Sequence, residues 1–85
     1  MDKIILLDLK PLDDYRLQLY FSTGEQKIFD VSPYISGTWY GKLQDLAYFK
    51  QVRIAFNTAQ WPDGQDIAPH ELYDNSVEYD EKTIA

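Results

Sequence analysis

Hydrophobic and polar side chains alternate over residues 16–21, which is the pattern of a β-strand that buries one of its two faces. Leu17, Leu19 and Phe21 share the apolar face. The loop that follows contains Gly24, which can take the positive φ that a tight hairpin turn requires. This stretch therefore predicts the first strand and the turn of an antiparallel hairpin.

Two neighbouring stretches extend this hairpin into a meander. Residues 26–30 lead back from the loop as the partner strand. Residues 3–10 precede the hairpin and contain an unbroken apolar run, Ile-Ile-Leu-Leu. Such a run predicts a strand that is buried on both faces or lies in the centre of the sheet. Together the three strands predict an antiparallel meander.

The middle of the chain predicts short helical pieces. Residues 32–35 begin with Ser-Pro, which resembles a helix start, and Gly37 limits the piece to about one turn of α- or 3₁₀-helix. Residues 38–41, Thr-Trp-Tyr-Gly, are predicted to form an aromatic loop. Residues 42–49 have apolar side chains at helical spacing, and we expect one or two further turns of helix there.

A second hairpin is predicted after these helices. Residues 51–56 alternate again, residues 57–58 supply a tight turn, and residues 59–61 return as a short strand. The apolar side chains of the first strand share one face: Val52, Ile54 and Phe56.

The last part of the chain predicts a turn, a helix and a tail. Pro-Asp-Gly at residues 62–64 is strong turn chemistry, and Pro69 suits the first position of a short helix. Residues 76–85 are predicted to be an acidic, mobile tail, with a weak edge strand as the alternative. The whole pattern predicts one α+β domain over residues 1–75: a three-stranded antiparallel meander, a second β-hairpin, and two or three short helices.

Composition narrows the class of protein. The chain has 85 residues, of which 45% are apolar and 15% aromatic, as expected for one folded domain with a small core. It has no cysteine, which excludes a disulfide scaffold and a thiolate metal site. It has neither a signal-peptide pattern nor an apolar stretch of about 20 residues that could cross a bilayer. We therefore expect a cytoplasmic protein without membrane association.

The net charge of −6 is unevenly distributed. Residues 1–50 carry seven acids and six bases, whereas residues 51–85 carry seven acids and only two bases. An acidic surface repels phosphate backbones, so direct nucleic-acid binding is not expected. The acidic C-terminal third could meet a basic partner, or it could simply keep the domain soluble.

The segment from Trp61 to Tyr73 is the most distinctive candidate site. It could be a binding loop, in which the two aromatic residues flank Asp63, Asp66 and His70. The interpretation that we favour is a turn that closes the fold, because each of its residue types has a local backbone role. Both interpretations remain open from the sequence alone.

A second candidate is the aromatic pair Trp39 and Tyr40, which lies between two glycines. The pair could pack over the sheet or form an exposed contact patch, since aromatic side chains often anchor interfaces.

Motifs for catalysis or metal binding are missing from the sequence. His70 is the single histidine, and one histidine with scattered acids falls short of a zinc site. Neither a nucleophile elbow nor a glycine-rich phosphate loop is present. We therefore predict no catalytic residue, no metal ion and no cofactor.

Four stretches, taken in order, resemble the bacterial family catalogued as domain of unknown function 2442. They are residues 12–17, residues 21–25 with 29–31 after them, residues 49–52, and Trp-Pro-Asp-Gly-Gln-Asp-Ile-Ala-Pro-His-Glu-Leu-Tyr at residues 61–73. The resemblance implies an α+β fold with a sheet and short helices, and no established catalytic residues. This chain departs from the family pattern at Ala68, where a polar helix cap is common.

The same resemblance implies a functional context. Family members occur alone or joined to a helix-turn-helix domain, which this chain lacks, and they are often encoded beside another small domain in a toxin–antitoxin-like arrangement. We therefore expect a non-catalytic protein-interaction module that acts through a partner protein or a second copy of itself. The alternative is a small-ligand-binding or catalytic domain that uses the segment 61–73.

Overall fold

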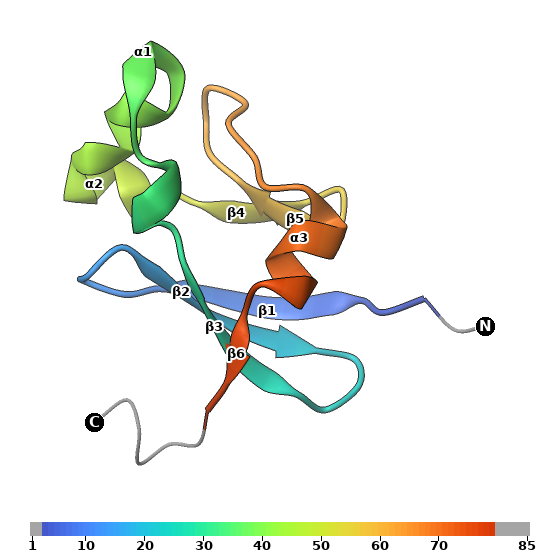
Figure 1. The fold of residues 1–85 in the computed structure, drawn as a ribbon. Helices are drawn as coiled ribbons and strands as arrows, with labels where there is room; N and C mark the ends of the chain where they lie inside the picture. The colour runs from blue at the N-terminus through green and yellow to red at the C-terminus, as the bar shows by residue number, and fades with distance from the viewer. Residues whose placement is uncertain (1–2, 80–85) are drawn as a thin grey trace.

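The computed structural model describes residues 3–79, with the side chains of residues 38 and 39 left out. Its strands form a four-stranded antiparallel sheet in the order β1-β2-β3-β6 and a separate two-stranded hairpin, β4-β5 (Figure 1). The described elements are β1 (Leu6–Pro11), β2 (Arg16–Phe21), β3 (Gln26–Asp30), the 3₁₀-helix η1 (Ser32–Tyr34), α1 (Gly37–Tyr40), the 3₁₀-helix η2 (Gly41–Gln44), α2 (Leu46–Phe49), β4 (Arg53–Ala55), β5 (Thr58–Gln60), α3 (Pro69–Asp74) and β6 (Val77–Glu78). The α+β class, the meander and the second hairpin are thus confirmed.

The strands β2 and β3 have the predicted bounds. Leu17 pairs with Phe29 across the two strands, and both side chains are fully buried. Gly24 takes φ +90° in the connecting loop, a conformation that glycine adopts without a steric penalty. Local alternation and local turn chemistry are therefore enough to define this hairpin.

The first strand differs from its prediction. β1 begins at Leu6 and forms an edge of the sheet, whereas the apolar run predicted a buried or central strand. The pairing with β2 is irregular at Leu7, which lies in a bulge and is 54% exposed. Bulges are common at sheet edges, where they interrupt the regular row of backbone groups that could pair with another strand.

The last described strand lies within the stretch predicted as a tail. Val77 of β6 pairs with Ile28 of β3, and the Tyr79 amide donates to the Gln26 carbonyl at 3.1 Å. Residues 77–78 thus form the edge strand considered as the alternative for this stretch. Residues 80–85 of the predicted tail lie outside the described residues.

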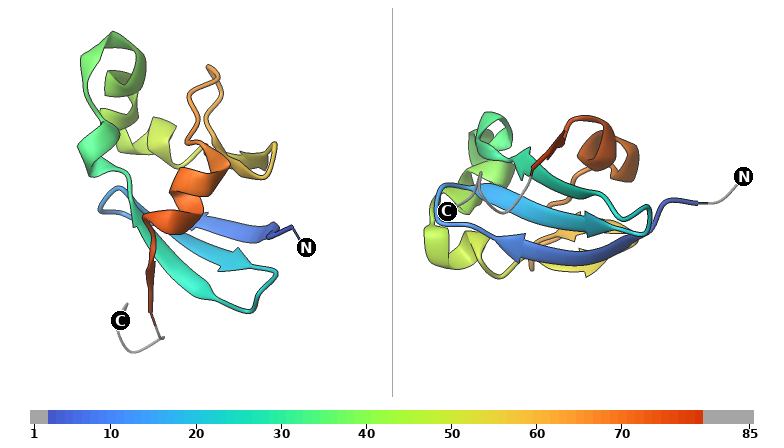
Figure 2. Two further views of the ribbon diagram at one scale, coloured as in Figure 1. Left: turned by 45° about the vertical axis from the view of Figure 1, so that its right-hand side comes forward. Right: turned by 90° about the horizontal axis from the view of Figure 1, so that it is seen from below.

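The helices and the second hairpin cover one face of the four-stranded sheet. Figure 2, seen from below, shows the strands of the meander with no helix in front of them. One turn of helix, α1, replaces the predicted aromatic loop, and it starts at Gly37 with φ +73°. The predicted helical stretch 42–49 divides into η2 and α2, because Asp45 caps α2 by accepting the Ala47 amide at 3.0 Å.

The turn of the second hairpin lies one residue earlier than predicted. Phe56 and Asn57 form the two-residue loop, with φ +52° and +63°. Both values belong to a type I′ turn, whose twist matches that of the flanking strands. Phe56 is therefore 86% exposed, and Ile54 is 40% exposed, instead of sharing a continuous strand face with Val52.

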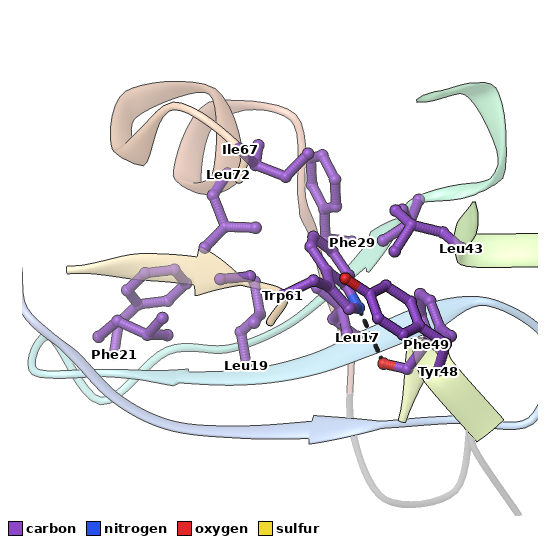
Figure 3. Packing of buried hydrophobic residues seen from close by; sticks show 13 residues of the cluster. Leu17, Leu19, Phe21, Phe29, Leu43, Tyr48, Phe49, Trp61, Ile67 and Leu72 are labelled. Carbon is purple, nitrogen blue, oxygen red and sulfur yellow. Dashed lines mark hydrogen bonds between the residues drawn. The ribbon is translucent and has the colours of Figure 1, made fainter. Parts of the chain in front are cut away.

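The core lies between the sheet and its covering layer (Figure 3). Trp61 is its largest fully buried side chain, and the indole Nε1 donates to the Phe49 carbonyl at 2.9 Å. The other buried apolar side chains are Leu6, Leu17, Leu19, Phe21, Phe29, Val31, Leu43, Tyr48, Phe49, Ala59, Ile67 and Leu72.

Candidate functional site

An apolar cleft of about 350 Å³ opens at one end of the molecule, beside helix α3. Figure 1 shows that the start of β1, the tip of the β4-β5 hairpin and α3 come together there. We call it the α3 cleft, and its lining residues are Ile4, Phe21, Asn57, Pro69, His70, Tyr73 and Asp74.

Asn57 joins the hairpin tip to the first strand. Its Oδ1 accepts the Leu6 amide at 2.8 Å, and its Nδ2 donates to the Ile4 carbonyl at 2.9 Å. The side chain thus provides the two hydrogen bonds that a neighbouring strand would otherwise provide at this edge. Because one of these bonds is to the backbone of Ile4, which lines the cleft, Asn57 contributes both to the docking of the hairpin on the first strand and to this wall of the cleft.

Lys27 and Glu25 hold Tyr73 in the opposite wall. The Lys27 ammonium is buried on the core side of β3, donates to the Tyr73 carbonyl at 2.8 Å, and lies 3.9 Å from the centre of the Tyr73 ring. A cation at the end of a helix also interacts favourably with its last carbonyl groups. The Tyr73 hydroxyl donates to Glu25, and the ring packs edge-on against Phe21.

The hydrogen bond between Tyr73 and Glu25 shifts the pKa of both groups. It raises the pKa of Tyr73 above its usual value of 10.0, because deprotonation would place a phenolate beside a carboxylate. It lowers the pKa of Glu25 below the usual 4.5, because the hydroxyl stabilises the charged carboxylate, and Thr23 adds a second hydrogen bond. The pair is therefore intact at neutral pH.

His70 and Asp74 form the polar rim of the cleft on α3. Both side chains are exposed, and neither forms a hydrogen bond or an ion pair with another described residue. They lie four positions apart and so share a helix face. Nowhere in residues 3–79 do three His, Asp or Glu side chains come together in a way that could hold a metal ion.

Phe56 stands next to Asn57 at the hairpin tip. A large side chain in the left-handed region costs about 1–2 kcal/mol of conformational strain, and at 86% exposure Phe56 gains little burial in return. Such an outlier is a reason to look for function at that residue.

The residues predicted in the segment 61–73 divide between the core and the surface. Trp61 is buried, and the turn after it is closed by the Gly64 amide, which donates to the Trp61 carbonyl at 2.9 Å. Asp63 forms an ion pair with Lys42 at 2.5 Å, which lowers the pKa of the carboxyl and raises that of the amine. His70 and Tyr73, by contrast, line the α3 cleft.

The other predicted site residues lie away from the cleft lining. The Tyr40 hydroxyl donates to the backbone carbonyl of Asp66 at 3.0 Å, which connects α1 to the segment before α3. The Asp66 side chain is exposed. Trp39 belongs to α1, but its side chain is outside the described part of the structure.

Sequence reasoning missed the residues that complete the site. Phe56 was assigned to a strand face, and Ile4 and Phe21 were expected only as parts of strands. Asn57 was placed in a turn, but its bonds to a strand more than fifty residues away could not be foreseen. The tolerance of asparagine for positive φ was the local signal that could have placed it second in a two-residue turn.

Two other hollows that described residues line are smaller and lie on the uncovered face of the sheet. One of about 220 Å³ and one of about 250 Å³ are both lined by Tyr79. No helix within residues 3–79 is long and apolar enough to span a membrane.

Removing the Tyr73 hydroxyl should flatten the pH dependence of stability. A lowered carboxyl pKa stabilises the fold at pH values above the ordinary carboxyl pKa. This stabilisation is lost as the pH falls through the lowered pKa. A raised phenol pKa stabilises the fold below pH 10.0, and this stabilisation is lost as the pH rises through the raised pKa. Tyr73→Phe is expected to have shallower acid and alkaline limbs in a Tm scan from about pH 3 to about pH 11. Tyr20→Phe, on the other face of the sheet, is the control, and equal slopes in both variants would contradict the expectation.

The fold and the cleft define a class: a small α+β domain in which an antiparallel sheet is covered on one face by short helices and a hairpin, with an apolar cleft at one end. Within this class, the chain belongs to the family described as protein of unknown function (DUF2442), whose model matches residues 6–78. The match confirms the resemblance seen in the sequence. No curated protein and no solved structure matches the chain.

Proposed function

We propose that this domain is a non-catalytic, cytoplasmic protein-interaction module that binds a partner protein through Phe56 and the α3 cleft. The observation that carries the proposal is Phe56, an aromatic side chain that is 86% exposed at φ +52° in a two-residue turn. Aromatic residues presented in this way are the usual anchors of protein interfaces. Burial against a partner would gain the apolar contact that the isolated domain does not provide.

The polar groups around the cleft fit binding better than catalysis. Asn57 and Tyr73 already use their side-chain groups in hydrogen bonds within the domain. His70 and Asp74 remain for a ligand, and among residues 3–79 no serine, threonine or cysteine lines the cleft beside them. A histidine and a carboxylate without a neighbouring nucleophile lack the constellation that covalent catalysis needs.

A toxin–antitoxin-like pair is the setting in which we propose to look for the partner, because the family resemblance implies a second small protein encoded nearby. The bulged edge β1 does not favour addition of a partner strand there. Side-chain docking at the cleft is therefore the mode of contact that we propose.

The test is quantitative capture of partner proteins from the native host with three tagged forms: wild type, Phe56→Gly and Val77→Ala. A partner should be recovered with wild type and Val77→Ala and should fall at least about tenfold with Phe56→Gly, as expected for an interface hot spot. Glycine relieves the strain at positive φ, so this variant should be as stable as wild type or more so. Val77 is 69% exposed on β6 and serves as the control for losing an exposed apolar side chain.

Binding and stability together decide the outcome. Equal recovery with Phe56→Gly would contradict the proposal, as would a large fall in its Tm. The most abundant protein recovered could be the domain itself, in an amount that depends on Phe56. That result would identify a second copy of the chain as the partner.

The alternative is a small-ligand site in the same cleft, and one observation favours it. A volume of about 350 Å³ lies at the lower end of the range for small-molecule sites. A metabolite that protects the isolated domain against unfolding, with the effect lost in His70→Ala but kept in Phe56→Gly, would support this alternative.

A further inference from the structure

The α3 cleft combines an apolar floor with a negatively charged rim. Ile4, Phe21 and the ring of Tyr73 supply the floor. Its volume of about 350 Å³ could hold one or two large side chains as well as a compact small molecule. An apolar side chain of a partner could therefore enter it while Phe56 packs outside.

The negative charge of the rim comes from Asp74, the acid in the lining of the cleft. Helix α3 carries Glu71 and Asp74 and contains neither lysine nor arginine. Lys27, the cation nearest to Tyr73, is buried and already donates to the Tyr73 carbonyl. The Glu25 carboxylate lies on the other side of Tyr73, and its lowered pKa keeps it charged.

Asp74 is the acid most exposed to a partner. It lines the cleft, and no ion pair involving it occurs among the described residues. It is also the last residue of α3, where a negative charge is unfavourable because the carbonyl ends of a helix are themselves negative. Asp74 thus resembles Phe56, in that each has a cost for the isolated fold that binding could offset.

We infer that the partner presents a linear polypeptide segment in which a large apolar side chain stands beside a lysine or arginine. The apolar side chain would fill the cleft, and the cation would pair with Asp74. This inference rests on the proposed function and adds the chemistry of the partner. Complementary charge at such a rim contributes mainly to specificity and to the rate of association.

The test starts from random peptides of about twelve residues displayed on phage, long enough for one turn of helix or one strand on each side of an anchor. The wild-type domain is the bait. Peptides that also bind the Phe56→Gly variant are discarded, because they bind the domain at another surface. Enriched sequences should contain a large apolar residue within about four positions of lysine or arginine, the reach of one helical turn.

Synthetic peptides from the enriched set are then measured by fluorescence anisotropy against charge variants. Asp74→Asn should weaken binding about three- to fivefold, the effect of one rim ion pair. Asp8→Asn makes the same change in net charge on the uncovered sheet face, and it should leave the affinity unchanged. Binding should also weaken between about 50 and about 500 mM salt, because salt screens exposed charges.

The possible results separate this inference from the proposed function. The enriched peptides could be apolar without a preference for lysine or arginine. If their binding is lost with Phe56→Gly but is unaffected by Asp74→Asn, the inference is overturned and the proposed function stands. Enrichment of acidic peptides, or of no sequence at all, would overturn the inference of a basic linear segment. A partner captured from the host that is indifferent to Phe56→Gly would overturn the proposed function.

Discussion

Trp61→Ala is expected to destabilise the domain strongly, and to unfold it at room temperature if the wild-type stability lies at the low end of the range for a domain of this size. Truncating a buried tryptophan costs about 3–5 kcal/mol, and Trp61 is 0% exposed, with its ring 5.8 Å from that of Phe49. An 85-residue domain has a total free energy of unfolding of only about 4–13 kcal/mol. The loss therefore removes about a quarter or more of the free energy of unfolding, and in a weakly stable domain all of it.

The hydrogen bond of Trp61 can be separated from its packing. Trp61→Phe keeps an aromatic ring in the core but leaves the Phe49 carbonyl without the indole donor. The loss of that partner costs about 1–3 kcal/mol at a buried site, so the free energy of unfolding should fall in the order wild type, Trp61→Phe, Trp61→Ala. Urea unfolding followed by far-UV circular dichroism measures the order without depending on tryptophan fluorescence.

Val77→Ala provides the control for this series, since Val77 is mostly exposed and its truncation should change stability little. The expectation would be wrong if Trp61→Ala unfolded within about 1 kcal/mol of wild type, the typical effect of an ordinary substitution. If Trp61→Ala stayed folded but lost partner binding, the result would support the interpretation of the segment 61–73 as a binding loop.

Asn57→Ala is expected to cost about 2–4 kcal/mol, from two lost hydrogen bonds and from strain at positive φ. The bonds to Leu6 and Ile4 are the ones that join the hairpin tip to β1. Asn57→Gly loses the same bonds but tolerates φ +63°, so it should be the more stable of the two variants by about 1 kcal/mol. Urea unfolding of the three forms gives both differences.

The same pair of variants reports on the cleft. Loss of the bond to the Ile4 carbonyl should loosen the start of β1, and amide hydrogen exchange at Ile5 and Leu6 should accelerate in both variants. Unchanged exchange there would show that the hairpin is held to β1 by packing alone. Equal stability of the alanine and glycine variants would show instead that the turn relaxes away from positive φ.

Prediction from sequence succeeded where the interactions are local. The bounds of β2 and β3 follow from alternation on either side of Gly24, and the first turn of α3 follows from Pro69. The failures have two sources: contacts between distant segments, as for β1, and local details such as the one-residue shift of the turn at Phe56 and Asn57. β1 reads as a buried strand because apolar residues are dense there, but its place at the edge depends on which strands pair with it.

The candidate site shows the same division. His70 and Tyr73 were found because they stand in a distinctive segment, and the structure places both at the α3 cleft. Phe56 was misplaced because a shift of one residue in a turn moves a side chain from a strand face to the tip. Asn57 was the local signal for the position of the turn, but the apolar Phe56 before it fits the alternation of the strand and favoured the wrong assignment.

The sequence by itself determined the α+β class and the family of this acidic chain, with a meander, a second hairpin and short helices. Periodicity, glycine and proline act within a few residues, so they leave a readable signal in the chain. Only the tertiary structure decided that Trp61 belongs to the core, that β1 and β6 are the two edges, and that Phe56 stands exposed beside the cleft. Burial and exposure at those positions depend on long-range packing, because a side chain is buried only if a distant segment folds over it.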